Sequence, residues 1–167
     1  YVDNADGSGS NVIADTDDVL FYFTGQARIG DIDTNGYRPG AIADHLTSFG
    51  GRVPTSGQMS VTEWLDAGVT GSYGTVIEPC NYQTKFPAAA VVIEHYWRGE
   101  TLVEAYWKSV QWPGEGLFVP RSGWLGMPPK SRRCPSLGFI GRRDLLPRVV
   151  HGHRVHLRHI AAQTSPE

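Results

Sequence analysis

His45 and Cys80 are the two residues of 1–119 whose types could form a catalytic pair, with the cysteine thiol as nucleophile and the histidine imidazole as base. Both residues fall near expected strand ends, and an α/β sheet forms its ligand crevice at the carboxyl ends of its strands. A nucleophilic cysteine needs a neighbouring base to lower its thiol pKa, and Asp44 or Glu78 could orient the imidazole. A buried cysteine and a hydrogen-bonded histidine are also ordinary structural features, and we favour this second interpretation.

A partial calcium-loop pattern is the other motif with chemical potential. Asp31, Asp33, Asn35 and Gly36 occupy the positions that such a loop uses first, but Ile42 stands where a bidentate glutamate belongs. We therefore expect an Asx-type turn and no metal site. The chain shows no phosphate loop, dinucleotide fingerprint, serine nucleophile elbow or zinc-type cysteine pattern, so no cofactor is expected.

Short apolar runs separated by turn residues predict the strands that would position these side chains. Residues 19–23 are typical of a buried strand, 41–47 fit a strand or a short helix, and 116–119 begin a last strand. Residues 69–77 predict another strand, whose glycines indicate close approach of its backbone to a neighbour or a ligand. Residues 30–39 are rich in Gly, Asp, Asn and Pro, which predicts turns throughout this segment.

Helix signals lie between these runs. Capping boxes at residues 60–63 and 101–104 predict a short helix and a second helix that reaches about residue 110. A proline and a glycine bracket a further helix over residues 88–98. Strands alternating with helices predict an α/β domain with a parallel or mixed sheet and flanking helices, in which Tyr96 and Trp107 are largely buried.

Charge divides the chain into two parts. Residues 1–119 hold six Lys/Arg and fifteen Asp/Glu, a net charge of −9, whereas residues 120–167 hold nine and two, a net charge of +7. The basic residues are scattered among apolar ones without a stripe or motif, so no nucleic-acid partner is expected. We expect residues 1–119 to be a partial α/β domain and residues 120–167 to be a tail that is either non-native, as from a shifted reading frame, or disordered.

Five strings carry a family resemblance, namely Asp18-Val-Leu-Phe-Tyr-Phe-Thr-Gly25, Pro39-Gly-Ala-Ile-Ala-Asp-His-Leu-Thr-Ser-Phe-Gly-Gly51, Gly57-Gln-Met-Ser60, Gly71-Ser-Tyr-Gly-Thr-Val-Ile-Glu-Pro-Cys-Asn81 and Gly99-Glu-Thr-Leu-Val-Glu-Ala-Tyr-Trp-Lys-Ser-Val110. Together they resemble an uncharacterised bacterial family found in bacteria that carry exosortase, the proposed sorting transpeptidase for exported proteins. The resemblance covers about residues 12–119 and implies that they are the C-terminal half of a longer domain. Relatives continue after the last strand with a Gly, Glu, Pro, Leu-type ending, where Pro120-Arg-Ser-Gly stands here.

We expect a non-catalytic binding or structural domain with a protein or peptide as ligand, and the resemblance implies that it belongs to an extracytoplasmic protein linked to exosortase-type sorting. The alternative is a cysteine-peptidase-like hydrolase domain using His45 and Cys80. It follows from a similarity in outline to caspase- and gingipain-type peptidases, because a His-bearing segment, a Gly-rich strand and a helix beginning Gly-Glu-Thr occur in that order. The longest apolar run, residues 88–93, is too short for a membrane span.

Overall fold

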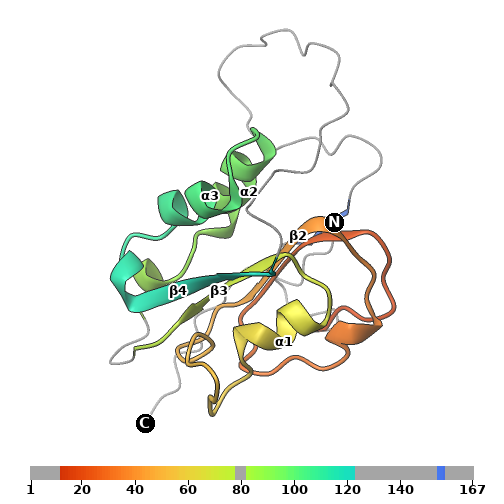
Figure 1. The fold of residues 1–167 in the computed structure, drawn as a ribbon, viewed down its shortest axis with the longest axis horizontal. Helices are drawn as coiled ribbons and strands as arrows, with labels where there is room; N and C mark the ends of the chain where they lie inside the picture. Colours follow the sequence, from red (N-terminus) through yellow and green to blue (C-terminus); the bar gives the residue numbers. More distant parts are fainter. Residues whose placement is uncertain (1–11, 78–81, 123–153, 157–167) are drawn as a thin grey trace, which may run out of the picture.

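The computed structural model describes residues 12–77, 82–122 and 154–156, which form a five-stranded mixed sheet with flanking helices (Figure 1). The strand order is β4-β3-β2-β1-β5; β4 runs antiparallel to β3, and the other neighbours are parallel. The predicted α/β class is therefore confirmed. The strands are β1 (Val19–Thr24), β2 (Tyr37–His45), β3 (Gly71–Thr75), β4 (Gly116–Pro120) and β5 (Arg154–His156).

Helices cover both faces of the sheet (Figure 1). Helix α1 (Val61–Asp66) lies on one face, and α2 (Ala89–Trp97) and α3 (Leu102–Ser109) lie on the other. Within the described residues, no helix is long and apolar enough to cross a membrane. Short 3-10 helices occupy Ile32–Thr34, Gln83–Lys85 and Pro113–Glu115.

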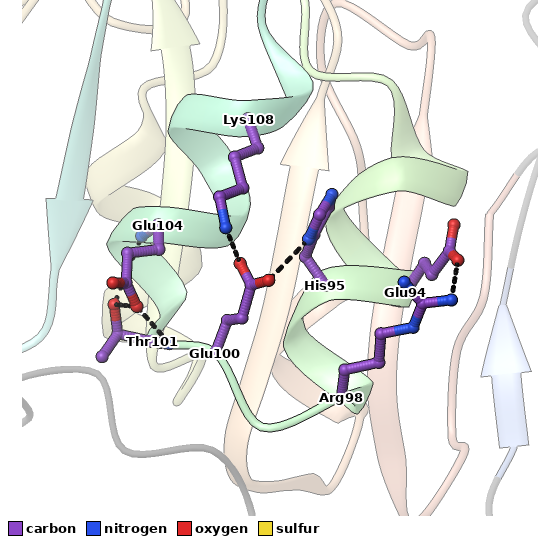
Figure 2. A network of polar contacts seen from close by, with 7 residues as sticks. All are labelled: Glu94, His95, Arg98, Glu100, Thr101, Glu104 and Lys108. Atoms are coloured by element: carbon purple, nitrogen blue, oxygen red, sulfur yellow. Dashed lines mark hydrogen bonds and ion pairs between the residues drawn. The ribbon is translucent and has the colours of Figure 1, made fainter.

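Both predicted capping boxes are present, which explains where α1 and α3 begin. The Ser60 N–H donates to Glu63 Oε1 at 3.0 Å, and the Thr101 N–H donates to Glu104 Oε2 at 2.9 Å (Figure 2). These carboxylates satisfy backbone donors that have no partner within the helix. Helix α1 is followed by Gly68 at φ +107°, a left-handed conformation that glycine adopts readily.

Two apolar cores result from the alternation of side chains along β1. Phe21 faces α2, where its ring meets Tyr96 edge-on with centroids 6.3 Å apart. Tyr22 faces α1, where it meets Trp64 edge-on at 5.1 Å. The Tyr96 hydroxyl also donates to the Gly40 carbonyl at 3.1 Å, so the predicted burial of Tyr96 is confirmed and is satisfied by a hydrogen bond.

The prediction that residues 30–39 are a turn throughout is wrong at its last three positions. Strand β2 begins at Tyr37, which is paired with Val19 of β1. Proline at position 39 is compatible with this strand because the regular pairing with β1 is interrupted here by an irregularity and resumes at Ile42.

The predicted burial of Trp107 is also wrong, because its side chain is 50% exposed. The buried stripe of α3 runs through Leu102, Ala105, Tyr106 and Ser109. Each helical residue is about 100° further around the axis than the one before, so Trp107 lies beyond the edge of this stripe. An aromatic residue in an amphipathic helix is thus placed by its angular position and not by its hydrophobicity alone.

Candidate functional site

The carboxyl end of β2 carries Asp44 and His45, the two predicted site residues that lie within the described part of the chain. Backbone pairing between β2 and β3 is recorded at a single residue pair near the start of β3. Beyond it, the Asp44 side chain and the loop after β2 make the contacts to β3. The Gly51 N–H donates to the Thr75 carbonyl at 2.9 Å, and the Thr75 hydroxyl donates to the Thr47 carbonyl at 2.6 Å.

Glycine at two positions permits this contact. A Cβ atom on Gly51 would lie 2.2 Å from the Gly74 carbonyl oxygen, and one on Gly74 would lie 2.4 Å from the Gly51 nitrogen. Any larger residue at either position would force the backbones apart. The close approach predicted from the glycines in residues 69–77 is confirmed, and the neighbour is the protein's own loop.

Asp44 is fully buried between β2 and β3 and accepts three hydrogen bonds. Its Oδ1 accepts from the Tyr73 N–H at 2.6 Å and from the Ser72 hydroxyl at 3.0 Å, and its Oδ2 accepts from the Tyr106 hydroxyl at 2.8 Å. The Asp44 side chain therefore supplies an acceptor for a β3 backbone N–H where backbone pairing with β2 is not recorded. It also ties β2 to α3 through Tyr106.

Burial raises the pKa of Asp44 to about 7, although the hydrogen bonds from Tyr73, Tyr106 and Ser72 favour the ionised form. Tyr106 is buried beside it, and the pKa of this phenol is raised well above its usual value. The larger cause is burial, and the second is the charge of the neighbouring Asp44 carboxyl. The cluster therefore contains a neutral phenol and a carboxyl that exchanges its proton near neutral pH. A carboxyl of this kind could act as an acid or base only if a substrate reached it, and its exposed fraction is zero.

His45 is held on the other face of the sheet by hydrogen bonds to both ring nitrogens. The Trp64 indole N–H donates to Nδ1 at 3.0 Å, so Nδ1 is the acceptor and Nε2 carries the proton that is donated to the Met59 carbonyl. Burial lowers the pKa of His45, which favours this neutral form. A Cβ atom on Gly50 would lie 2.6 Å from Nε2, so the loop encloses the ring closely.

Asp44 and His45 do not contact each other through their side chains, because consecutive residues of a strand point to opposite faces. Asp44 points toward α3 and His45 points toward α1. Asp44 is thus positioned to hold Tyr73 and Tyr106, and it lies across the sheet from the imidazole, so of the two candidates for orienting His45 it is not the one that does so.

The other two predicted site residues, Glu78 and Cys80, lie outside the described residues. A residue that sequence reasoning missed lies beside that segment. Lys85 is 1% exposed, and its Nζ donates to Ser48 Oγ and to the Ile77 carbonyl, both at 3.4 Å. It links the loop after β2 to the chain that leaves β3. Its local sequence, Gln-Thr-Lys within turn-like surroundings, carries no signal of burial.

The calcium-like segment forms a short 3-10 helix, Ile32–Thr34, in place of the expected Asx-type turn, since the side chain of Asp31 at its start accepts no capping hydrogen bond. The Asn35 side-chain nitrogen donates to the Asp31 carbonyl at 3.2 Å and to the Ile13 carbonyl at 2.8 Å, so this amide ties two loops together. Asp31 and Asp33 line a surface hollow together with acidic residues of α1. No group of three or more His, Cys, Asp or Glu side chains in the described ranges is arranged to hold a metal ion.

Comparison with protein-family models, with curated proteins and with solved structures finds no match for this chain. Its local geometry is therefore the basis for a functional proposal.

Proposed function

We propose that this chain is a non-catalytic binding or structural domain in which Asp44 and His45 stabilise the sheet. The observation that carries the proposal is the use of both His45 ring nitrogens in hydrogen bonds inside the core. A general base needs a nitrogen that can accept the proton of its nucleophile or substrate. Only Nδ1 of His45 has a lone pair in this tautomer, and the Trp64 indole N–H occupies it.

The surroundings of Asp44 support the same proposal. All three of its donors are protein groups from β3 and α3, and its side chain has no exposed surface. A carboxyl used in catalysis must touch its substrate or a residue that does. The contacts of Asp44 instead join two strands and a helix, which is a structural role.

The cellular context of the proposal rests on the sequence resemblance. A domain from the exosortase-associated family would belong to an extracytoplasmic protein linked to protein sorting, and its ligand would be a protein or a peptide. A rigid sheet with helices on both faces suits such a role, because binding surfaces are most specific when a rigid scaffold positions them.

The competing proposal is a cysteine-peptidase-like hydrolase using His45 and Cys80. His45 favours it in one respect, since it stands at the carboxyl end of a parallel strand, where α/β enzymes place reactive groups. The competing proposal requires the imidazole to release Trp64 and to turn out of the core.

Thiol labelling distinguishes the two proposals. In a Cys134→Ser variant, the reaction of Cys80 with iodoacetamide is followed across pH, and Cys80→Ser serves as the control in which Cys134 alone reacts. We expect Cys80 to titrate near the value of a free cysteine, about 8.5, with no change in a folded His45→Gln variant. A midpoint below about 7 that His45→Gln raises would show a thiol activated by His45, which contradicts the structural role and favours the hydrolase proposal.

A further inference from the structure

Strand β4 is the outermost strand on its side of the sheet, and in the described part of the chain no strand pairs with its outer edge (Figure 1). Its sequence is Gly-Leu-Phe-Val-Pro, and its three large apolar side chains are half-buried. Edge strands of soluble proteins are commonly protected by charged side chains or proline, or are covered by another element, and β4 has one such residue, Pro120, at its last position. An uncharged apolar edge such as this one is suited to pairing with another strand.

The hydrogen-bond pattern with β3 shows which backbone groups point outward. The Arg121 N–H donates to the Thr70 carbonyl, and the Glu115 carbonyl accepts from the Val76 N–H. Alternate residues of an antiparallel strand point their N–H and C=O groups to the same side. Odd-numbered residues of β4 therefore face β3, and Gly116, Phe118 and Pro120 present their backbone groups to the free edge.

We propose that the outer edge of β4 and the adjoining flank of α3 form a two-fold interface with a second copy of this chain, in which the two β4 strands pair antiparallel with Phe118 opposite Phe118. The interface joins the two sheets into one. It uses neither Asp44 nor His45, so the proposal is independent of the proposed function.

The register follows from the outward groups and from charge. With Phe118 opposite its copy, the two Phe118 residues exchange two N–H to C=O bonds, and each Gly116 N–H meets a Pro120 carbonyl. A register with Leu117 opposite Leu117 would give the same number of backbone hydrogen bonds between the two copies, four. Only the Phe118 register places Glu115 opposite Arg121 of the other copy at each end of the paired strands, where opposite charges stabilise the pair.

The flank of α3 above this edge is apolar and exposed. On the opposite flank, Lys108 Nζ bonds to Glu100 at 2.7 Å, and Glu100 bonds to His95 of α2 at 2.8 Å, so that flank faces α2 (Figure 2). Val103 and Trp107 lie one helical turn apart on the side away from α2 and are 42% and 50% exposed.

Helix α3 lies over β3 and β4, because Tyr106 stacks on Tyr73 at 6.1 Å and contacts Phe118 at 4.9 Å between ring centroids. Neighbouring strands are about 4.8 Å apart, so a two-fold axis beside β4 would place the two α3 helices about 10 Å apart. That spacing is the usual distance between packed helices. Val103 and Trp107 of each copy would then pack against the other, which explains why they are apolar.

The test is the mass of the full 167-residue chain in solution, measured by sedimentation equilibrium over a range of concentrations. We expect a dimer, and we expect Trp107→Lys to raise its dissociation constant about 30-fold without altering the circular dichroism spectrum, because Trp107 is exposed in one copy. Trp97→Lys, at a similarly exposed tryptophan on α2, is the matched control and should leave the dimer intact.

A charge exchange tests the register. Glu115→Arg and Arg121→Glu should each weaken the dimer about tenfold, and the double variant should restore it. The two residues stand at opposite ends of one strand, about 20 Å apart, so they cannot compensate each other within one copy. Three results would each overturn the proposal: a chain that is monomeric at 100 μM or above, a dimer whose dissociation constant is unchanged by Trp107→Lys, and a double variant that does not recover dimerisation. A monomer is the result expected if another segment of this chain covers the edge of β4.

Discussion

Replacing Asp44 by asparagine should change how the stability of the domain depends on pH. The pKa of Asp44 is raised to about 7 by burial, from a value of 3.8 in the unfolded chain. Between these two values the folded state holds a proton that the unfolded state has lost, so the free energy of unfolding falls as pH rises. Below pH 3.8 both states are protonated and the carboxyl exerts no penalty.

The size of the effect follows from the difference between the two pKa values. It is about three units, and each unit corresponds to 1.36 kcal/mol, which makes the loss about 4 kcal/mol between pH 4 and pH 8. Asparagine has nearly the same shape and keeps an oxygen to accept from Tyr73 and Ser72, while its NH2 group can donate to the Tyr106 oxygen. It carries no charge at any pH, so this loss is absent from Asp44→Asn.

The assay is urea unfolding of both proteins at half-unit steps from pH 4 to pH 8, which gives the free energy of unfolding of each. Subtracting the Asp44→Asn curve cancels the titration of all other groups. We expect the difference to move by about 4 kcal/mol in favour of Asp44→Asn as pH rises. A flat difference, or one that moves in favour of Asp44 at high pH, would refute the reasoning, because the carboxyl would then be ionised in the fold without penalty.

Three further changes test the contacts around the site. Gly74→Ala should lower the free energy of unfolding by about 3 kcal/mol, because its Cβ would lie 2.4 Å from the Gly51 nitrogen. Gly57→Ala is the control and should be nearly neutral, because a Cβ there meets nothing within 4 Å. Thermal unfolding measures both variants, and equal shifts of their midpoints would contradict the close approach of Gly74 to Gly51. Trp64→Phe should cost about 1–3 kcal/mol in urea unfolding, since it leaves the buried His45 Nδ1 without a donor, and a neutral result would mean that this bond is not formed. Thr101→Ala should cost about 1 kcal/mol through loss of the α3 cap, and thermal unfolding followed by circular dichroism measures it; an unchanged midpoint would show that the cap does not stabilise the helix.

Local signals in the sequence were sufficient for β1, β3, β4 and the three α-helices, whereas β5 lies in residues 120–167, where no strand was predicted. The capping boxes of α1 and α3 each involve residues three positions apart, so the pattern that predicts them is complete within one turn. Strands β1 and β3 were predicted from apolar runs in the same way. The start of β2 at Tyr37 was missed because turn residues also occur where a strand is irregular.

The contacts of the site could not be predicted, because they join residues far apart in the chain. Asp44 was singled out from its position at a strand end, but its bond to Tyr106 spans 62 residues and depends on how α3 crosses the sheet. His45 and Trp64 are likewise brought together by the packing of α1. Lys85 has no local mark of burial, since its partners belong to the loop after β2 and to the end of β3.

The protonation of His45 tests the central claim most directly, and a long-range nitrogen–proton NMR spectrum measures it. The His45 signals are assigned by their loss in His45→Gln. We expect a neutral ring protonated at Nε2 with Nδ1 as acceptor, which takes up its second proton only at a lower pH than an ordinary histidine because burial lowers the pKa of this residue. A ring protonated at Nδ1 with a free Nε2, or an imidazolium that forms at its ordinary pKa near 6.5, would contradict the structural role of His45.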